Sequence, residues 1–136
     1  MIPRNVKSVI TTPYQSDHLK VVCVCSGGVL RSPTMARILT MPPFNFNTRS
    51  CGTEDYALVT ISQSLVYWAD IIVCAETYHR SVVESVMDNA YIAGEVRPPI
   101  FTMNIPDEYD YCDPELVDIS TEKLKRFFNV EQNPIS

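Results

Sequence analysis

Several residue types and patterns are scarce or missing in this sequence, and each absence excludes a class of protein. No apolar run is long enough to cross a bilayer, and no uninterrupted apolar segment follows Arg4 and Lys7, so we expect neither a membrane protein nor a secreted one. The net charge is −5 and the basic residues form no cluster, which argues against nucleic acid as a partner. Histidine occurs only at His18 and His79, so we expect no metal site.

The cysteine count and the composition set further bounds. Five cysteines are an odd number, which argues against a closed disulfide framework, and without an export signal we expect them as thiols in the cytoplasm. A length of 136 residues fits one domain, and 46% hydrophobic residues suffice for a core. The first residues are polar and mixed, so we expect an N-terminal lead-in over 1–19 and a single domain over 20–136.

Buried strands alternate with helices along the chain. The β-branched and cysteine run from Val21 to Cys25 suits a strand covered on both faces, and Ser32 before Pro33 is a favourable helix start. Patterns of these kinds predict strands near 21–25, 46–49, 70–75 and 98–103, and helices near 32–39, 58–68, 77–87 and from 113 onward. This alternation predicts an α/β fold, a three-layer sandwich with a central four-stranded parallel sheet flanked by helices.

One loop at the end of the first strand is suited to holding an anion. In parallel α/β sheets, ligands bind at the carboxyl ends of the strands, and this loop joins such an end to a helix N-terminus. Its two glycines permit positive φ angles, so successive N–H groups can converge on one point, and the helix adds partial positive charge. The loop reads Cys25-Ser26-Gly27-Gly28-Val29-Leu30-Arg31-Ser32. It predicts a cradle the size of one phosphate.

Three side chains of this loop have chemical roles in that interpretation. A thiol at Cys25, beside a helix N-terminus and a cation, ionises easily and becomes a nucleophile. The planar guanidinium of Arg31 matches two phosphate oxygens, and the Ser32 hydroxyl can donate to the thiolate. The loop lacks the Gly-Lys-Ser/Thr of a nucleoside triphosphate site. The alternative is that Cys25 is a structural cysteine beside a glycine turn.

Taken together, these motifs resemble the low-molecular-weight protein tyrosine phosphatase family. The likeness runs from about residue 20 to the end and looks closest to a compact bacterial and phage branch. The similar stretches are the phosphate loop Cys25-x5-Arg31-Ser32-Pro33, the Ser50-Cys51-Gly52-Thr53 segment, the strand region Trp68 to Val73, the helix start Glu76 to Arg80, and the acidic loop Ile105-Pro106-Asp107-Glu108-Tyr109.

The resemblance implies a cysteine-dependent phosphatase that requires no metal or cofactor and acts on a phosphotyrosine protein or a small aryl phosphate. It implies that Cys25 is the nucleophile, Arg31 the phosphate ligand and Ser32 the residue that tunes the thiolate. Asp107 would be the general acid; Asp110 is the runner-up, and Asp113 is interpreted as a helix cap. Residues Ser26, Gly27, Gly28, Val29 and Leu30 would contact the substrate, with Tyr56 and Tyr109 as aromatic walls.

Three departures from the family pattern and two alternative functions remain at this stage. Glu108 replaces the usual proline, which adds negative charge beside Asp107. Gly28 stands where the family usually has an asparagine whose polar network braces the loop, and Leu30 stands where it often has a second cysteine. His79 is expected on a solvated helix face. Arsenate reduction would need a resolving thiol, for which Cys51, Cys74 and Cys112 are available. The other alternative is a phosphate-binding module without catalysis.

Overall fold

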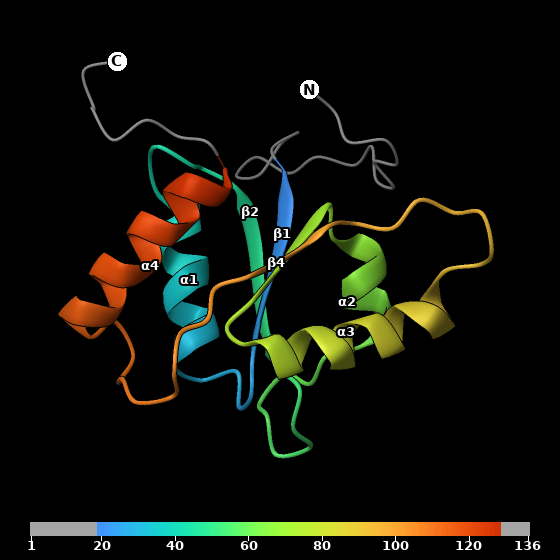
Figure 1. Cartoon of the computed structure of the whole chain (residues 1–136), viewed down its shortest axis with the longest axis horizontal. Helices are drawn as coiled ribbons and strands as arrows, with labels where there is room; N and C mark the ends of the chain where they lie inside the picture. Colours follow the sequence, from blue (N-terminus) through green and yellow to red (C-terminus); the bar gives the residue numbers. More distant parts are fainter. Residues whose placement is uncertain (1–18, 129–136) are drawn as a thin grey trace.

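Four strands and four helices alternate along residues 19–128, the part of the chain that the computed structural model describes. In chain order they are β1 (Lys20–Cys25), α1 (Arg31–Thr40), β2 (Asn47–Gly52), α2 (Gln63–Trp68), β3 (Ile71–Cys74), α3 (Thr77–Ala90), β4 (Ile100–Thr102) and α4 (Pro114–Phe127). The strands pair in parallel in the order β2-β1-β3-β4 (Figure 1). The predicted four-stranded parallel sheet is therefore confirmed. The predicted lead-in lies, apart from residue 19, outside the described residues.

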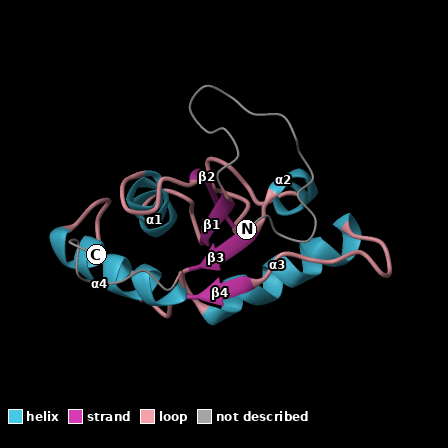
Figure 2. Cartoon of the chain, turned by 90° about the horizontal axis from the view of Figure 1, so that it is seen from above, coloured by secondary structure: helices cyan, strands magenta, loops and turns pink. Residues whose placement is uncertain are grey.

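The central strand β1 is covered on both faces, which makes the fold a three-layer sandwich (Figure 2). On one face Cys23 and Cys25 pack with α1 and α4, including Leu39 and Leu116. The other face buries alternate residues of β1, among them Val24, against α2 and α3. Burying one such aliphatic side chain contributes about 1.5–3 kcal/mol, so these two clusters hold the helices to the sheet.

Two helix starts differ from the sequence-based expectation. The helical spacing from Leu58 onward is misleading, because Leu58 is 82% exposed and α2 begins only at Gln63, where the Ser62 side chain accepts from the Leu65 N–H. At α1 the helix begins at Arg31, and the Ser32 hydroxyl is not used as a cap. The predicted cap on α4 is present, since the Asp113 carboxylate accepts from the Glu115 N–H.

The loops that follow the four strands meet at the carboxyl edge of the sheet, at the bottom of Figure 1. Backbone hydrogen bonds join them: Thr53 N–H donates to the Cys25 carbonyl at 2.9 Å, and Ile105 N–H donates to the Ala75 carbonyl at 2.9 Å. This edge therefore gathers the loop after β1, the loop after β2 and the acidic loop after β4. Among the described residues, no helix has the length and apolarity needed to cross a membrane.

Candidate active site

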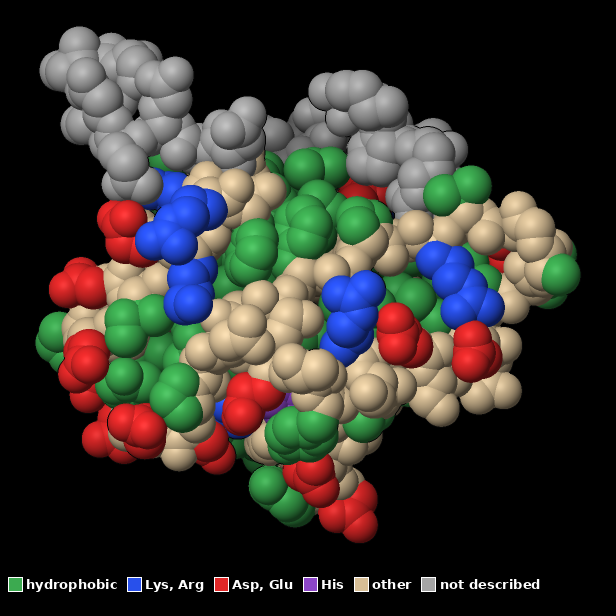
Figure 3. All heavy atoms as spheres, viewed as in Figure 1, with side chains coloured by type: hydrophobic (Ala, Val, Ile, Leu, Met, Phe, Trp, Pro, Cys, Tyr) green, Lys and Arg blue, Asp and Glu red, His purple; other side chains and the backbone are tan. Residues whose placement is uncertain are grey.

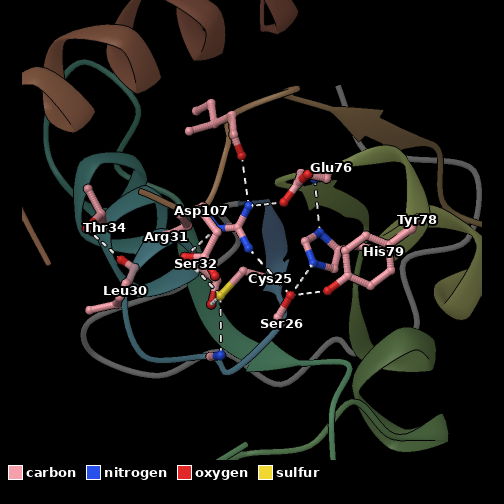
Figure 4. Close-up of polar contacts among 12 residues, drawn as sticks. Cys25, Ser26, Leu30, Arg31, Ser32, Thr34, Glu76, Tyr78, His79 and Asp107 are labelled. Atoms are coloured by element: carbon pink, nitrogen blue, oxygen red, sulfur yellow. Dashed lines mark hydrogen bonds and ion pairs between the residues drawn. The ribbon is translucent and has the colours of Figure 1, made fainter. Parts of the chain in front are cut away.

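The loop after β1 curls around the sulfur of Cys25. The N–H of Gly28 donates to Cys25 Sγ at 3.2 Å, and the N–H of Ser32 donates to it at 3.4 Å (Figure 4). Gly28 has a φ of 70°, and a Cβ there would lie 3.0 Å from backbone atoms of Cys51 and Gly52. Glycine is therefore required for the curl, because a side chain would meet the neighbouring strand.

Cys25 lies at the bottom of this loop, between the loop amides and the core. Its side chain is 2% exposed, and one side of it contacts the cluster around α1. The thiol donates to Ser32 Oγ at 3.1 Å, and that hydroxyl donates to the Cys51 carbonyl at 3.2 Å. The hydroxyl and the two N–H groups give the Cys25 sulfur three polar neighbours.

The other buried thiols are in a different environment. Burial raises the pKa of Cys51 to about 12, with a smaller contribution from Cys25, and burial likewise raises the pKa of Cys74 to about 12. Burial also raises the pKa of Cys23 well above its usual value. All five cysteines are free thiols in the structure. The three buried ones named here stay protonated at neutral pH, so they are inert as nucleophiles.

Arg31, the first residue of α1, is a buried cation held by groups from three loops. Its Nη1 forms an ion pair with Glu76 and donates to the Ile105 carbonyl at 2.8 Å. Its Nη2 donates to Ser26 Oγ at 3.4 Å, and its Nε lies 3.7 Å from Asp107 Oδ1. A buried arginine with such partners has one fixed orientation, beside the curled loop. The sequence indicated Arg31 but gave no role to its partner Glu76.

Of the three acidic candidates, Asp107 is the one that contacts the arginine. Its side chain is 59% exposed, so it borders the site without being enclosed by it. Asp113 is occupied as the cap of α4, and the carbonyl of the exposed Asp110 accepts from the Asp113 N–H. Figure 3 shows acidic side chains gathered along the lower part of the face, over the loops at the carboxyl edge. Of the three, the structure brings Asp107 to Arg31.

The two predicted aromatic walls lie in different surroundings. Tyr56 is 71% exposed, and its ring edge would be 3.4 Å from a Cβ built on Gly27. The pKa of Tyr56 is raised by partial desolvation and then by Glu54, Tyr78, Asp107 and Cys25, which places the ring near the site. Tyr109 instead packs against the core and its hydroxyl donates to Glu115 at 3.2 Å. The structure therefore brings Tyr56 beside the loop, and the role of Tyr109 as an aromatic wall stays a prediction.

The remaining predicted loop residues form the rim and the end of the curl. Val29 is largely exposed, and Leu30 precedes α1, where its carbonyl accepts from the N–H of Thr34 at 3.2 Å. Ser26 is buried, and its hydroxyl contacts Tyr78 and lies 3.0 Å from His79 Nε2.

The prediction for His79 is wrong. The residue is fully buried behind the loop, because the side of the first turn of α3 that carries it packs against Ser26. Burial and the neighbouring Arg31 lower the pKa of His79 to about 4. One sequence signal could have indicated this: His79 is three residues after Glu76, the spacing at which a side chain satisfies the free N–H at a helix start. The Glu76 N–H does donate to His79 Nδ1, at 3.0 Å.

Comparisons with known proteins place this geometry in a known fold. No family model and no curated protein matches the chain. Among solved structures, Wzb of Vibrio vulnificus in complex with benzylphosphonate is 18% identical with a TM-score of 0.62, over 82% of this chain and 98% of that one. A low-molecular-weight protein tyrosine phosphatase of Streptococcus pyogenes is 14% identical with a TM-score of 0.63, over 86% and 95%.

A third solved structure has a different stated substrate. The arginine phosphatase YwlE of Geobacillus stearothermophilus is 16% identical with a TM-score of 0.53, over 84% of this chain and 95% of that one. At these identities the likeness shows the fold. The chain has the fold of the low-molecular-weight protein tyrosine phosphatases, as the resemblance in the sequence implied.

Proposed function

We propose that this chain is a cysteine-dependent phosphatase that hydrolyses phosphate monoesters, with a phosphotyrosine protein or a small aryl phosphate as substrate. The observation that carries the proposal is the convergence of the Gly28 and Ser32 amides on the Cys25 sulfur, beside the buried guanidinium of Arg31. Amide dipoles and a fixed cation favour negative charge both on the sulfur and directly in front of it.

In the first step the Cys25 thiolate attacks phosphorus, so that an S–P bond forms as the bond from phosphorus to the leaving oxygen breaks. The loop amides and Arg31 hold the equatorial oxygens, and Asp107 gives its proton to the leaving oxygen. Arg31 is already oriented by Glu76 and the Ile105 carbonyl, so the guanidinium does not have to reorganise during the reaction.

In the second step water attacks the cysteinyl-phosphate, Asp107 takes up the proton of that water, and the S–P bond breaks to release phosphate. The departing sulfur carries negative charge again. The Ser32 hydroxyl, 3.1 Å from the sulfur, can turn from the Cys51 carbonyl to donate to that charge. The same group would therefore assist both the formation and the release of the thiolate.

The surroundings of the loop suit an aromatic leaving group. The exposed ring of Tyr56 stands beside Gly27, where it can stack on the substrate ring. Among the similar solved structures, the Streptococcus pyogenes protein is a protein tyrosine phosphatase and the Vibrio vulnificus protein is in complex with benzylphosphonate. The Geobacillus stearothermophilus protein is an arginine phosphatase. Phosphotyrosine is therefore the first substrate to test, and phosphoarginine the second.

Arsenate reduction is the less favoured activity. It needs a thiol able to reach Cys25, yet Cys51 and Cys74 belong to the cluster on the other face of the sheet. Their thiols are also held protonated by burial, which raises the pKa of each to about 12. The structure therefore offers neither of them as the resolving thiol.

The test is hydrolysis of para-nitrophenyl phosphate at mildly acidic pH, without added metal, by the native chain and by Cys25→Ser. We expect turnover that vanadate inhibits in the native chain and none in the variant. Phosphotyrosine and phosphoarginine peptides then assign the substrate class. Tight binding of phosphotyrosine peptides without any turnover would replace the proposal by the non-catalytic alternative.

A further inference from the structure

Ser26 is the centre of a hydrogen-bond network that the proposed mechanism does not use. Its Oγ lies 3.0 Å from His79 Nε2, accepts from Arg31 Nη2 at 3.4 Å, and contacts the Tyr78 hydroxyl (Figure 4). Ser26 directly follows Cys25 in the loop, whereas Tyr78 and His79 belong to the first turn of α3. The network therefore ties the loop after β1, at the carboxyl edge of the sheet, to the start of α3.

The protons in this network have one consistent arrangement. His79 Nδ1 accepts from the Glu76 N–H at 3.0 Å, so a neutral ring carries its proton on Nε2 and donates it to Ser26 Oγ. The ring is neutral at ordinary pH because its burial and Arg31 lower its pKa to about 4, against the opposing effect of Glu76 and Asp107. Ser26 Oγ then accepts from His79 and Arg31, and its own proton goes to the Tyr78 oxygen.

The loop needs support of this kind because Gly28 provides none. A glycine has no side chain to hold the curl, and even a Cβ at this position would meet the backbone of β2. Ser26 is the loop residue whose side chain contacts both the guanidinium of Arg31 and a neighbouring helix.

We propose that His79 is a positioning residue that acts through Ser26, holding the loop around Cys25 and the Arg31 guanidinium in the geometry that binds a phosphoryl oxyanion. This inference rests on the proposed phosphatase function and extends it to a residue that does not touch the substrate. It assigns the two ring nitrogens different tasks: Nδ1 satisfies the start of α3, and Nε2 holds the loop.

Two substitutions separate those tasks. His79→Asn places an oxygen near the position of Nδ1 and keeps the bond from the Glu76 N–H, but it cannot reach Ser26. His79→Gln places an amide N–H near the position of Nε2 and keeps the bond to Ser26, but it leaves the Glu76 N–H unsatisfied. We expect His79→Asn to be the more stable variant and His79→Gln the more active one. A residue with only a structural role would give the same order in both measurements.

The experiment measures kcat/KM for para-nitrophenyl phosphate, the inhibition constant of vanadate and the thermal unfolding midpoint for each variant. For His79→Asn we expect both kcat/KM and vanadate affinity to fall between about 10-fold and 100-fold, the cost of a misplaced site. Ser26→Ala should show a similar loss, and the double variant Ser26→Ala with His79→Asn should lose little more. Ser81→Ala, an exposed serine on the same helix, is the control that should match the native chain.

Three results would overturn the inference. They are native vanadate affinity in His79→Asn, additive losses in the double variant, and the same rank order of stability and activity for the two His79 variants. A native chain that neither turns over para-nitrophenyl phosphate nor binds vanadate would instead refute the proposed function. The native control therefore distinguishes the two failures.

Discussion

Glu76, at the start of α3, forms an ion pair with Arg31, at the start of α1, across the carboxyl edge of the sheet. The two helices cover opposite faces of the sheet, so the pair connects the outer layers directly. Arg31 is buried and cannot be solvated if its partner is lost. The pair therefore matters to stability as well as to the orientation of the guanidinium.

Glu76→Gln tests how much the ion pair between Glu76 and Arg31 stabilises the folded chain. The variant keeps the shape of the side chain but leaves Arg31 with the more distant Asp107 as its acidic neighbour. We expect the free energy of unfolding to fall by about 1–3 kcal/mol, measured by urea denaturation. Glu84→Gln, which breaks the exposed pair with Arg80, should change it by less than about 0.5 kcal/mol. Equal losses in the two variants would contradict the special role of the buried pair.

Substitutions of the acidic loop test the choice of general acid. Asp107→Asn should lower kcat for para-nitrophenyl phosphate by about 10²–10⁴-fold, because the leaving oxygen loses its proton donor. Asp110→Asn should have little effect, since the structure places Asp107 and not Asp110 beside Arg31. A larger loss in Asp110→Asn than in Asp107→Asn would reverse the assignment.

Two glycines with positive φ make a matched pair for testing the curl of the loop. Gly94→Ala should cost about 1–2 kcal/mol of stability, because its φ is 90° but no atom lies within 4 Å of the new Cβ. Gly28→Ala should cost more, since its Cβ would also lie 3.0 Å from backbone atoms of Cys51 and Gly52. It should also weaken vanadate binding, whereas Gly94→Ala should not. Urea denaturation and vanadate inhibition measure the two effects.

The buried imidazole of His79 predicts a dependence of stability on pH. The folded chain keeps this ring neutral down to about pH 4, because burial and Arg31 lower its pKa, while in an unfolded chain the imidazole takes up the proton near its ordinary pKa of 6.5. The contribution of the neutral His79 ring to the free energy of unfolding is therefore complete above about pH 6.5. It falls as the pH drops towards 4 and falls no further below that. It amounts to up to about 3 kcal/mol.

Urea denaturation of the native chain and of His79→Asn between pH 4 and 7 measures this contribution. The carboxylates titrate in both chains, so the difference between the two curves isolates the histidine. We expect the native chain to lose its advantage over the variant as the pH falls. A constant difference across this range would show that His79 does not carry the effect.

The sheet and the curled loop after β1 could be predicted from the sequence because they rest on local patterns. The run from Val21 to Cys25 is apolar at every position, and such a run suits a strand with two covered faces. The loop after it joins glycines, a cysteine and an arginine at a spacing that has a clear chemical meaning. Such signals lie within one segment of the chain, so no tertiary contact is needed to find them.

Contacts between distant segments account for what the sequence did not indicate. His79 follows an ordinary helix start, and its burial depends on the position of the loop around Ser26, 53 residues earlier. The Ser32 hydroxyl is expected beside the Cys25 sulfur, but its second partner, the Cys51 carbonyl, is 19 residues away in the sequence and no local pattern indicates it. Tyr109 lies in the expected loop, but the core and Glu115 hold it. In each case packing selects one of several partners that the residue type allows.

The carbonyl that holds the Arg31 guanidinium belongs to Ile105, 74 positions further along the chain. During synthesis, Cys25 and the glycines of the loop emerge long before the Ile105 carbonyl does. A nascent or truncated chain that ends before β4 would contain the whole Cys25–Ser32 segment and Glu76, but it would lack the Ile105 carbonyl and Asp107 as partners of Arg31. Oxyanion affinity should therefore reach its full value only when the segment after β4 has docked, and it can serve as a reporter of that step.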